Sequence, residues 1–201
     1  YGHRNHEYFV CHNGDSKNKI RLHDTRVSLL DQNKFVNSLP IPPSEKFGVS
    51  WKLYPPRIDL DAHEIFMDND VVLHKKIEFE KYSETCLISE AVKRSYGSFD
   101  DRIKESVPMN SGLFGLPSGF DFGSSLSETI LKFNVHWHNS YFEEQGTVAY
   151  VVSNREHVVL RKKDMGLAWQ NAPDFIGEYG THFIGLNSGY SDYWKKYRTI
   201  F

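Results

Sequence analysis

The sequence predicts an α/β protein, and we expect residues 1–201 to form one domain. Short apolar runs that read as β-strands alternate with segments whose apolar residues recur at helical spacing. At 201 residues the chain is long enough to bury a substantial core in a single domain. We find no internal repeat, linker or low-complexity segment that would divide it.

The composition is that of an ordinary globular chain. Hydrophobic residues make up 39%, charged residues 25%, and the formal net charge is −2, so nothing marks a nucleic-acid partner. The aromatic share of 14% suits a core of large rings and equally a surface on which sugars stack. Because no apolar run reaches the roughly 18 residues of a membrane span, we expect no span. No signal-peptide pattern is visible either.

Cysteine use and the chain start bear on the compartment. The two cysteines, Cys11 and Cys86, lie in strand-like runs and are expected as buried thiols rather than as a disulfide. The first residue is Tyr1 rather than Met, which fits a piece of a longer chain. We expect a cytoplasmic protein, and a luminal domain cut from its anchor stays an alternative.

The amino-terminal third holds two expected strands. Residues 8–11 form an apolar run that feeds an Asn-Gly-Asp turn, and residues 26–30 form a second run. Because open α/β sheets bind ligands at the carboxyl ends of their strands, Asn13 and Asp15 are candidates for ribose or base contacts. A hairpin turn chosen for backbone shape explains the same residues.

Residues 44–53 follow a proline-rich break and are expected to form a helix that Pro55 and Pro56 end. Lys52 near the end of this segment is a candidate for a diphosphate contact, and an exposed surface lysine is the plainer alternative.

An acidic pair follows the apolar run at residues 65–67, which we expect to be a short, fully buried strand; residues 71–73 resume the apolar character. Asp68 and Asp70 therefore lie at a strand end, where two carboxylates one residue apart can converge on one hard cation. The pair predicts a divalent-metal site, with a solvated Asp-Asn-Asp turn as the alternative.

The middle of the chain continues the alternation. We expect a strand at residues 85–88, a helix start at 89–91 and a core-facing helix at 126–137. Residues 107–116 read as a strand interrupted by Asn-Ser-Gly, and a glycine inside a strand often marks a bulge or the close approach of a ligand.

Two later segments add candidate site residues. A helix over residues 142–150 starts with Glu143, Glu144 and Gln145, where the helix dipole favours carboxylates and a plain N-terminal cap is the other explanation. His182, between a glycine and an apolar pair, is a candidate third metal ligand or a structural histidine.

Four segments, taken in order, resemble the glycogenin-type branch of the GT-A-fold glycosyltransferases. They are Trp51-Lys52-Leu53 with the Asp-x-Asp strand at 65–70, Asn110-Ser111-Gly112-Leu113-Phe114, Glu144-Gln145-Gly146, and His182-Phe183-Ile184-Gly185. The resemblance covers residues 50 to 185 and implies a Rossmann-like domain with a mixed central sheet flanked by helices. Residues 7–16 resemble the second strand of that fold, so either the first strand is missing or the amino end is organised differently.

The resemblance implies a hexosyltransferase that uses Mn²⁺ or Mg²⁺ and a nucleotide-diphosphate sugar, by family default a UDP-sugar. The acceptor would be a hydroxyl of a glycan, a glycoprotein or another molecule, and the resemblance points to retention. It implies that the metal is bound by Asp68, Asp70 and His182, and that Asp68 also reaches the ribose. The residues expected to line the donor sugar are Lys52, Asn110 and Gln145. The resemblance also implies that Glu144 lies near the anomeric centre and that the Gly185 backbone lies near the diphosphate.

The chain departs from the family pattern at two places. Residues 186–188 stand where the family continues to a lysine, and the candidate substitutes are Lys195, Lys196 and Arg198. Glu144 stands in place of an aspartate, with one more methylene.

Two other functions fit parts of the sequence. In a haloacid-dehalogenase-type phosphatase, Asp68 would be the nucleophile and Asp70 the general acid, with residues 86–89 as a second motif. That family also needs a later acidic pair at a strand end, and the nearest pair, Asp100-Asp101, lies in a polar segment. A non-catalytic sugar-binding domain of the same fold is the other alternative.

Overall fold

The computed structural model describes residues 6–12, 25–41, 48–136, 141–168 and 176–184, and every structural statement below concerns these. Within them the protein is a mixed α/β structure with few helices, which confirms the predicted class. The described strands form three small sheets, of two, four and three strands, rather than one central sheet. Two of the three sheets combine parallel and antiparallel pairs.

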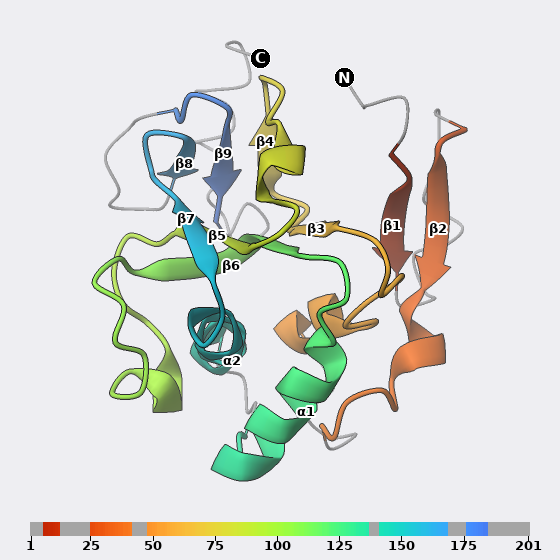
Figure 1. The fold of residues 1–201 in the computed structure, drawn as a ribbon, viewed down its shortest axis with the longest axis vertical. Helices are drawn as coiled ribbons and strands as arrows, with labels where there is room; N and C mark the ends of the chain where they lie inside the picture. The colour runs from red at the N-terminus through yellow and green to blue at the C-terminus, as the bar shows by residue number, and fades with distance from the viewer. Residues whose placement is uncertain (1–5, 13–24, 42–47, 137–140, 169–175, 185–201) are drawn as a thin grey trace.

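The four-stranded sheet occupies the middle of the molecule (Figure 1). In spatial order its strands are β3 (Glu64–Met67), β6 (Met109–Leu116), β5 (Cys86–Glu90) and β7 (His157–Leu160). β6 runs antiparallel to both neighbours, while β5 and β7 are parallel. Every residue of β6 is buried, as expected for the strand that carries the core.

The three-stranded sheet follows directly from the acidic turn. Its strands are β4 (Val71–Leu73), β9 (Gly180–Phe183) and β8 (Met165–Ala168). β4 begins right after Asp70 and pairs antiparallel with β9, and the register places Val71 opposite His182. The pairing therefore brings the histidine beside the acidic turn, although about 110 residues separate them in sequence.

The two-stranded sheet pairs β1 (Tyr8–His12) with β2 (Val27–Asp31) in parallel, and it lies at the right of Figure 1. Both strands were expected from their apolar runs.

Two α-helices cover one side of the four-stranded sheet (Figure 1). They are α1 (Phe122–Phe133) and α2 (Tyr141–Ser153), and α2 packs on β5 and β6 and against α1. The largest fully buried side chains include Tyr54, Phe99, Phe114 and Phe122, which belong to the main core cluster of aromatic and aliphatic residues. The 3₁₀ helices are η2 (Gln32–Phe35), η4 (Gly48–Leu53), η5 (Phe79–Tyr82) and η6 (Gly97–Phe99).

Several local expectations were wrong for identifiable reasons. β3 is not fully buried, because it is an edge strand that pairs only with β6, and Met67 is 46% exposed. Residues 89–91 do not start a helix, since Ser89 and Glu90 complete β5 beyond a β-bulge. α1 ends at Phe133 rather than Trp137 because Asn134 takes a left-handed conformation that caps it.

The cysteine expectation holds in part. Neither Cys11 nor Cys86 forms a disulfide, but Cys11 is exposed rather than buried. The expected helix at 44–53 is described only over Gly48–Leu53, as the 3₁₀ helix η4. Over the described ranges, no helix combines the length and apolar character needed to cross a bilayer.

Candidate functional site

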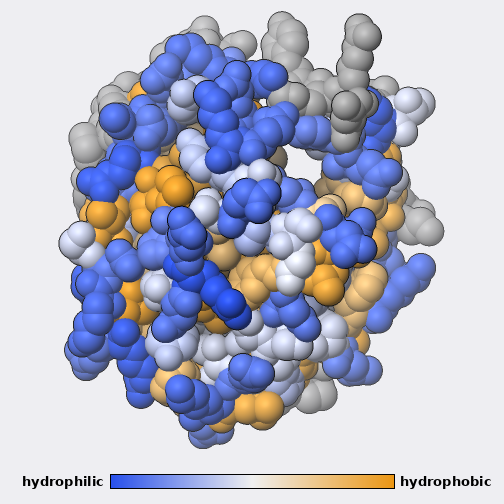
Figure 2. All heavy atoms as spheres, in the orientation of Figure 1, coloured by the Kyte–Doolittle hydropathy of each residue, from blue (hydrophilic) through white to orange (hydrophobic). Residues whose placement is uncertain are grey.

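A cleft of about 1,810 Å³ opens between the β1 strand, the ends of β3 and β6, and the start of α2. Figure 2 shows this face hollowed between the β1–β2 side and the rest of the molecule. Among the residues lining the cleft are seven predicted site residues: Lys52, Asp68, Asp70, Asn110, Glu144, Gln145 and His182. The other predicted ligand contacts, at Asn13, Asp15 and Gly185, lie outside the described residues, as do Lys195, Lys196 and Arg198.

Asp68, Asp70 and His182 form a group of candidate metal ligands whose ligand atoms all lie within 4.8 Å of one another. The His182 Nε2 atom lies 3.0 Å from Asp70 Oδ1 and 3.8 Å from Asp68 Oδ2. Neighbouring ligands of an octahedral Mg²⁺ at 2.0–2.1 Å are about 2.9 Å apart and opposite ones about 4.2 Å apart. The spacing therefore fits one divalent cation, and the group confirms that the acidic pair and the histidine come together.

Backbone hydrogen bonds hold the acidic turn in place. The Asp68 N–H donates to the Gly112 carbonyl (2.8 Å), and the Val71 N–H donates to the Asp68 carbonyl (3.1 Å). The Phe183 N–H donates to the Asp70 carbonyl (2.9 Å). Each aspartate is thus anchored to a different sheet, which fixes the geometry of the carboxylates more firmly than a solvated turn would.

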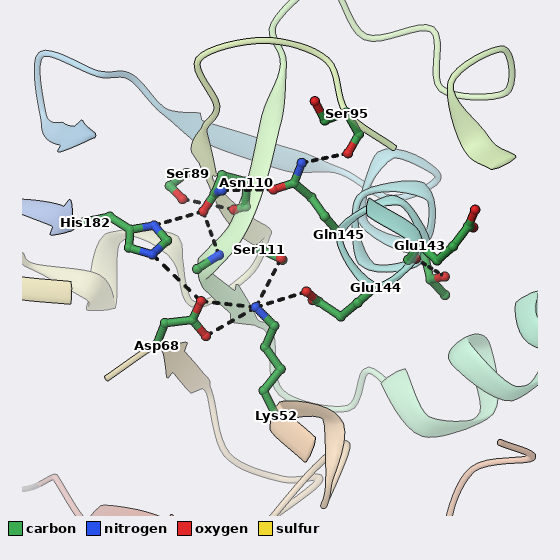
Figure 3. A network of polar contacts seen from close by, with 12 residues as sticks. Lys52, Asp68, Ser89, Ser95, Asn110, Ser111, Glu143, Glu144, Gln145 and His182 are labelled. Atoms are coloured by element: carbon green, nitrogen blue, oxygen red, sulfur yellow. Dashed lines mark hydrogen bonds and ion pairs between the residues drawn. The ribbon is translucent and has the colours of Figure 1, made fainter. Parts of the chain in front are cut away.

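Lys52 carries a positive charge into this group from η4. Its Nζ lies 3.2 Å from both carboxylate oxygens of Asp68, 3.2 Å from Glu144 Oε2 and 3.3 Å from Ser111 Oγ (Figure 3). Burial lowers the pKa of Lys52, but the carboxylates of Glu144 and Asp68 outweigh it, and the pKa is raised above its usual value. Lys52 is therefore a charged member of the site, not an exposed surface lysine.

Glu144, which the resemblance places near the anomeric centre, differs from its neighbour Glu143 in burial and in contacts. Glu144 is 2% exposed, and its Oε1 is buried without a hydrogen-bond partner in the described structure. Burial raises the pKa of Glu144, which Lys52 opposes and Asp68 reinforces. Glu143 instead accepts hydrogen bonds from the backbone N–H (2.9 Å) and hydroxyl (2.8 Å) of Ser98, so it fastens α2 to η6.

Asn110 and Gln145, predicted to line a donor sugar, are hydrogen-bonded to each other (Figure 3). The Asn110 Nδ2 donates to Gln145 Oε1 (2.9 Å), and the Gln145 Nε2 donates to the Ser95 carbonyl (2.9 Å). Asn110 Oδ1 accepts from the Gly112 N–H (2.8 Å) and lies 3.1 Å from His182 Nδ1. A chain of polar contacts thus runs from the start of α2 to the candidate metal ligand.

Sequence reasoning missed the parts played by Ser111 and Gly112. Ser111 lies inside the Asn-Ser-Gly motif, but nothing in the motif shows that its hydroxyl meets Lys52. The glycine in this strand was expected to mark a bulge or the close approach of a ligand, whereas the group that approaches it is the ring of His182: a Cβ on Gly112 would lie 2.0 Å from its Cε1.

The comparisons with known proteins return no match, either among protein-family models or among curated proteins.

Proposed function

We propose that this protein is a metal-dependent glycosyltransferase of GT-A-like fold that moves a hexose from a nucleotide-diphosphate sugar, with uridine as the expected nucleoside, to a hydroxyl acceptor. The observation that supports it best is the convergence of four sequence segments on one cleft. These segments meet around a candidate metal group, and they contribute Lys52 with the 68–70 turn, Asn110, the 144–145 pair, and His182. We propose Mn²⁺ or Mg²⁺ as the metal.

The charge pattern suits this reaction. Glycosyl transfer releases a nucleoside diphosphate, and a divalent metal, when bound, would supply positive charge to the departing group. Asp68, Asp70 and His182 would hold that metal, and Lys52 keeps the Asp68 carboxylate oriented through both of its oxygens. The single positive charge of Lys52 faces the carboxylates of both Asp68 and Glu144, and Asp70 adds a third acidic group. One ammonium cannot balance three carboxylates, so the site can still attract a cation.

The chain's own acid can position a hydroxyl. Glu144 lines the cleft, and its buried Oε1 has no hydrogen-bond partner in the described structure, so this oxygen has the capacity to accept a hydrogen bond from a donor or acceptor hydroxyl. We assign it the role of orienting the reacting groups at the anomeric centre, with Asn110 and Gln145 beside the sugar, and we propose retention of configuration.

The geometry gives less support to the phosphatase. That family needs a later acidic pair at a strand end, whereas Asp100 caps the 3₁₀ helix η6 and Asp101 follows it. Ser89 donates its hydroxyl to the Asn110 carbonyl (3.0 Å) instead of facing Asp68, and Asp100 and Asp101 do not line the cleft.

Calorimetric titration with UDP-glucose, in Mn²⁺ and then in EDTA, tests the proposal. We expect Mn²⁺-dependent binding that Asp70→Asn abolishes without unfolding the chain, because the change removes a ligand charge and no core contact. UDP release in the presence of sugar acceptors separates a transferase from a sugar-binding domain. Glu144→Gln should lower that turnover strongly, and Glu143→Gln, one residue away and bonded to Ser98, should not.

Binding that is equal in Mn²⁺ and EDTA would contradict the metal role. Phosphate-ester hydrolysis that requires Asp68, with no nucleotide-sugar binding across a panel of donors, would instead support the phosphatase.

A further inference from the structure

We propose that Asn110 is a positioning residue for the candidate metal ligand His182: its amide oxygen binds the Nδ1–H of the ring and so presents Nε2 to the metal. This inference rests on the metal site of the proposed function. It assigns Asn110 a task separate from contacting a donor sugar, and it makes Gln145 the partner that holds Asn110 in place.

Backbone groups at both ends fix the orientation of the two amides. The Gly112 N–H can only donate, so the Asn110 atom that it meets at 2.8 Å is the oxygen Oδ1. At the other end the Ser95 carbonyl can only accept, so the Gln145 atom that it meets at 2.9 Å is the nitrogen Nε2. The middle bond, from Asn110 Nδ2 to Gln145 Oε1 at 2.9 Å, then has a donor and an acceptor in their proper places. If either amide were rotated by 180°, two donors or two acceptors would face each other.

This assignment decides the protonation of one edge of the His182 ring. Asn110 Oδ1 lies 3.1 Å from Nδ1 and, as a carbonyl oxygen, can only accept, so the proton of this contact is on Nδ1. Nε2 is then the nitrogen left to bind a cation, and it is the one that faces Asp70 Oδ1 at 3.0 Å and Asp68 Oδ2 at 3.8 Å. The two edges of one ring therefore have distinct roles.

Burial strengthens the effect. His182 is 6% exposed and Asn110 is 8% exposed, so water competes poorly for Nδ1. Histidine ligands generally donate their second N–H to a fixed acceptor, and loss of that acceptor typically costs about 10- to 100-fold in metal affinity. Figure 3 shows the ring between Asn110 on one side and Asp68 on the other.

Mn²⁺ affinity of the whole chain, measured by the electron paramagnetic resonance signal of free Mn²⁺, provides the test. We expect Asn110→Ala to weaken binding about 10- to 100-fold. Asn110→Asp should bind Mn²⁺ more tightly than Asn110→Ala, because one carboxylate oxygen still accepts from Nδ1–H and from the Gly112 N–H, while the other loses the bond to Gln145 Oε1. Ser89→Ala is the matched control, since its hydroxyl meets the backbone carbonyl of Asn110 and does not contact His182.

A spectroscopic readout separates positioning from general packing. In ¹⁵N-histidine-labelled protein loaded with diamagnetic Mg²⁺, the Nδ1 proton of His182 should be observable in the wild type. It should move downfield in Asn110→Asp, where the acceptor is charged, and be lost to exchange with water in Asn110→Ala. Should Asn110→Ala fail to fold, the downfield shift in Asn110→Asp still decides.

The outcomes separate this inference from the proposed function. A wild type that binds no Mn²⁺ overturns the metal site, and the positioning role with it. A wild type that binds Mn²⁺ while a folded Asn110→Ala binds it equally well overturns the positioning role alone. The positioning role alone is also overturned if the Nδ1 proton of His182 does not move in Asn110→Asp. It is likewise overturned if Ser89→Ala weakens Mn²⁺ binding as much as Asn110→Ala does.

Discussion

Gly112→Ala should disable the candidate metal site through a single methyl group. A Cβ built on Gly112 would lie 2.0 Å from His182 Cε1, 2.4 Å from Nδ1 and 2.7 Å from Asn110 Oδ1. Carbon atoms pack at about 3.5 Å or more, so the ring would have to shift by about 1.5 Å. Ligand distances in a metal site tolerate only about 0.2 Å, so Nε2 would leave its place beside Asp70.

We expect Gly112→Ala to lower Mn²⁺ affinity by at least about tenfold, which corresponds to about 1.4 kcal/mol. Crowding should also lower the metal-free unfolding free energy by about 1–3 kcal/mol. Calorimetric Mn²⁺ titration and urea unfolding in EDTA measure the two effects separately.

Gly115→Ala is the control, because it lies on the same strand and its added Cβ meets the flexible end of Ile65 at 2.7 Å, away from His182. It should lose stability and keep Mn²⁺ affinity. If a folded Gly112→Ala bound Mn²⁺ like the wild type, the inferred place of the His182 ring in the metal site would be wrong.

Three further predictions concern the scaffold. Arg57→Ala should lower the unfolding free energy by about 1–3 kcal/mol in a urea melt, because it leaves the half-buried Glu64 carboxylate, now 3.1 Å from the guanidinium, with only the backbone N–H groups of Ile58 and Asp59 as partners; a loss below that of an exposed ion pair would contradict this. Tyr54→Phe should be neutral or raise stability by about 1 kcal/mol, since the fully buried hydroxyl has no hydrogen-bond partner in the described structure; a lower melting temperature would reveal a missed partner. Burial raises the pKa of Cys86 to about 11 and the residue is 1% exposed, so at pH 8 its thiol should react with a thiol reagent far more slowly in the native protein than in the urea-unfolded chain. Exposed Cys11 should react first in the native protein, and equal rates for the two thiols would refute the placement of Cys86.

The strands could be predicted largely from local sequence, but their environment could not. The apolar run at 65–67 does form a strand, yet its burial depends on β6, which lies about 45 residues later and covers only one edge. Ser89 and Glu90 have the local character of a helix start, and they extend β5 because Asn110 and Met109 pair with them. Long-range pairing overrode local preference in both cases.

The site was predictable as a set of residues and not as a set of contacts. Asp68, Asp70 and His182 were each expected to bind metal, and the β4–β9 register brings them together. The bond between Lys52 and both oxygens of Asp68, and the one between Asn110 and His182, join positions 16 and 72 residues apart. No local pattern encodes such pairs, because they arise from how separate elements pack.

The acidic turn connects the four-stranded sheet to the three-stranded sheet, so a cation bound there would affect the stability of both. Asp68 directly follows β3 of the four-stranded sheet. Asp70 directly precedes β4, and His182 belongs to β9, and both of these strands are in the three-stranded sheet. A cation held by all three would cross-link the two sheets. Among the described residues, one small core cluster of the three-stranded sheet has Ala168 and Phe183 as its buried members. At a metal concentration 100 times the Kd, binding adds about 2.7 kcal/mol to the folded state, and we expect much of this to appear as slower hydrogen exchange in β8 and β9. The cation would then be a structural part of the protein.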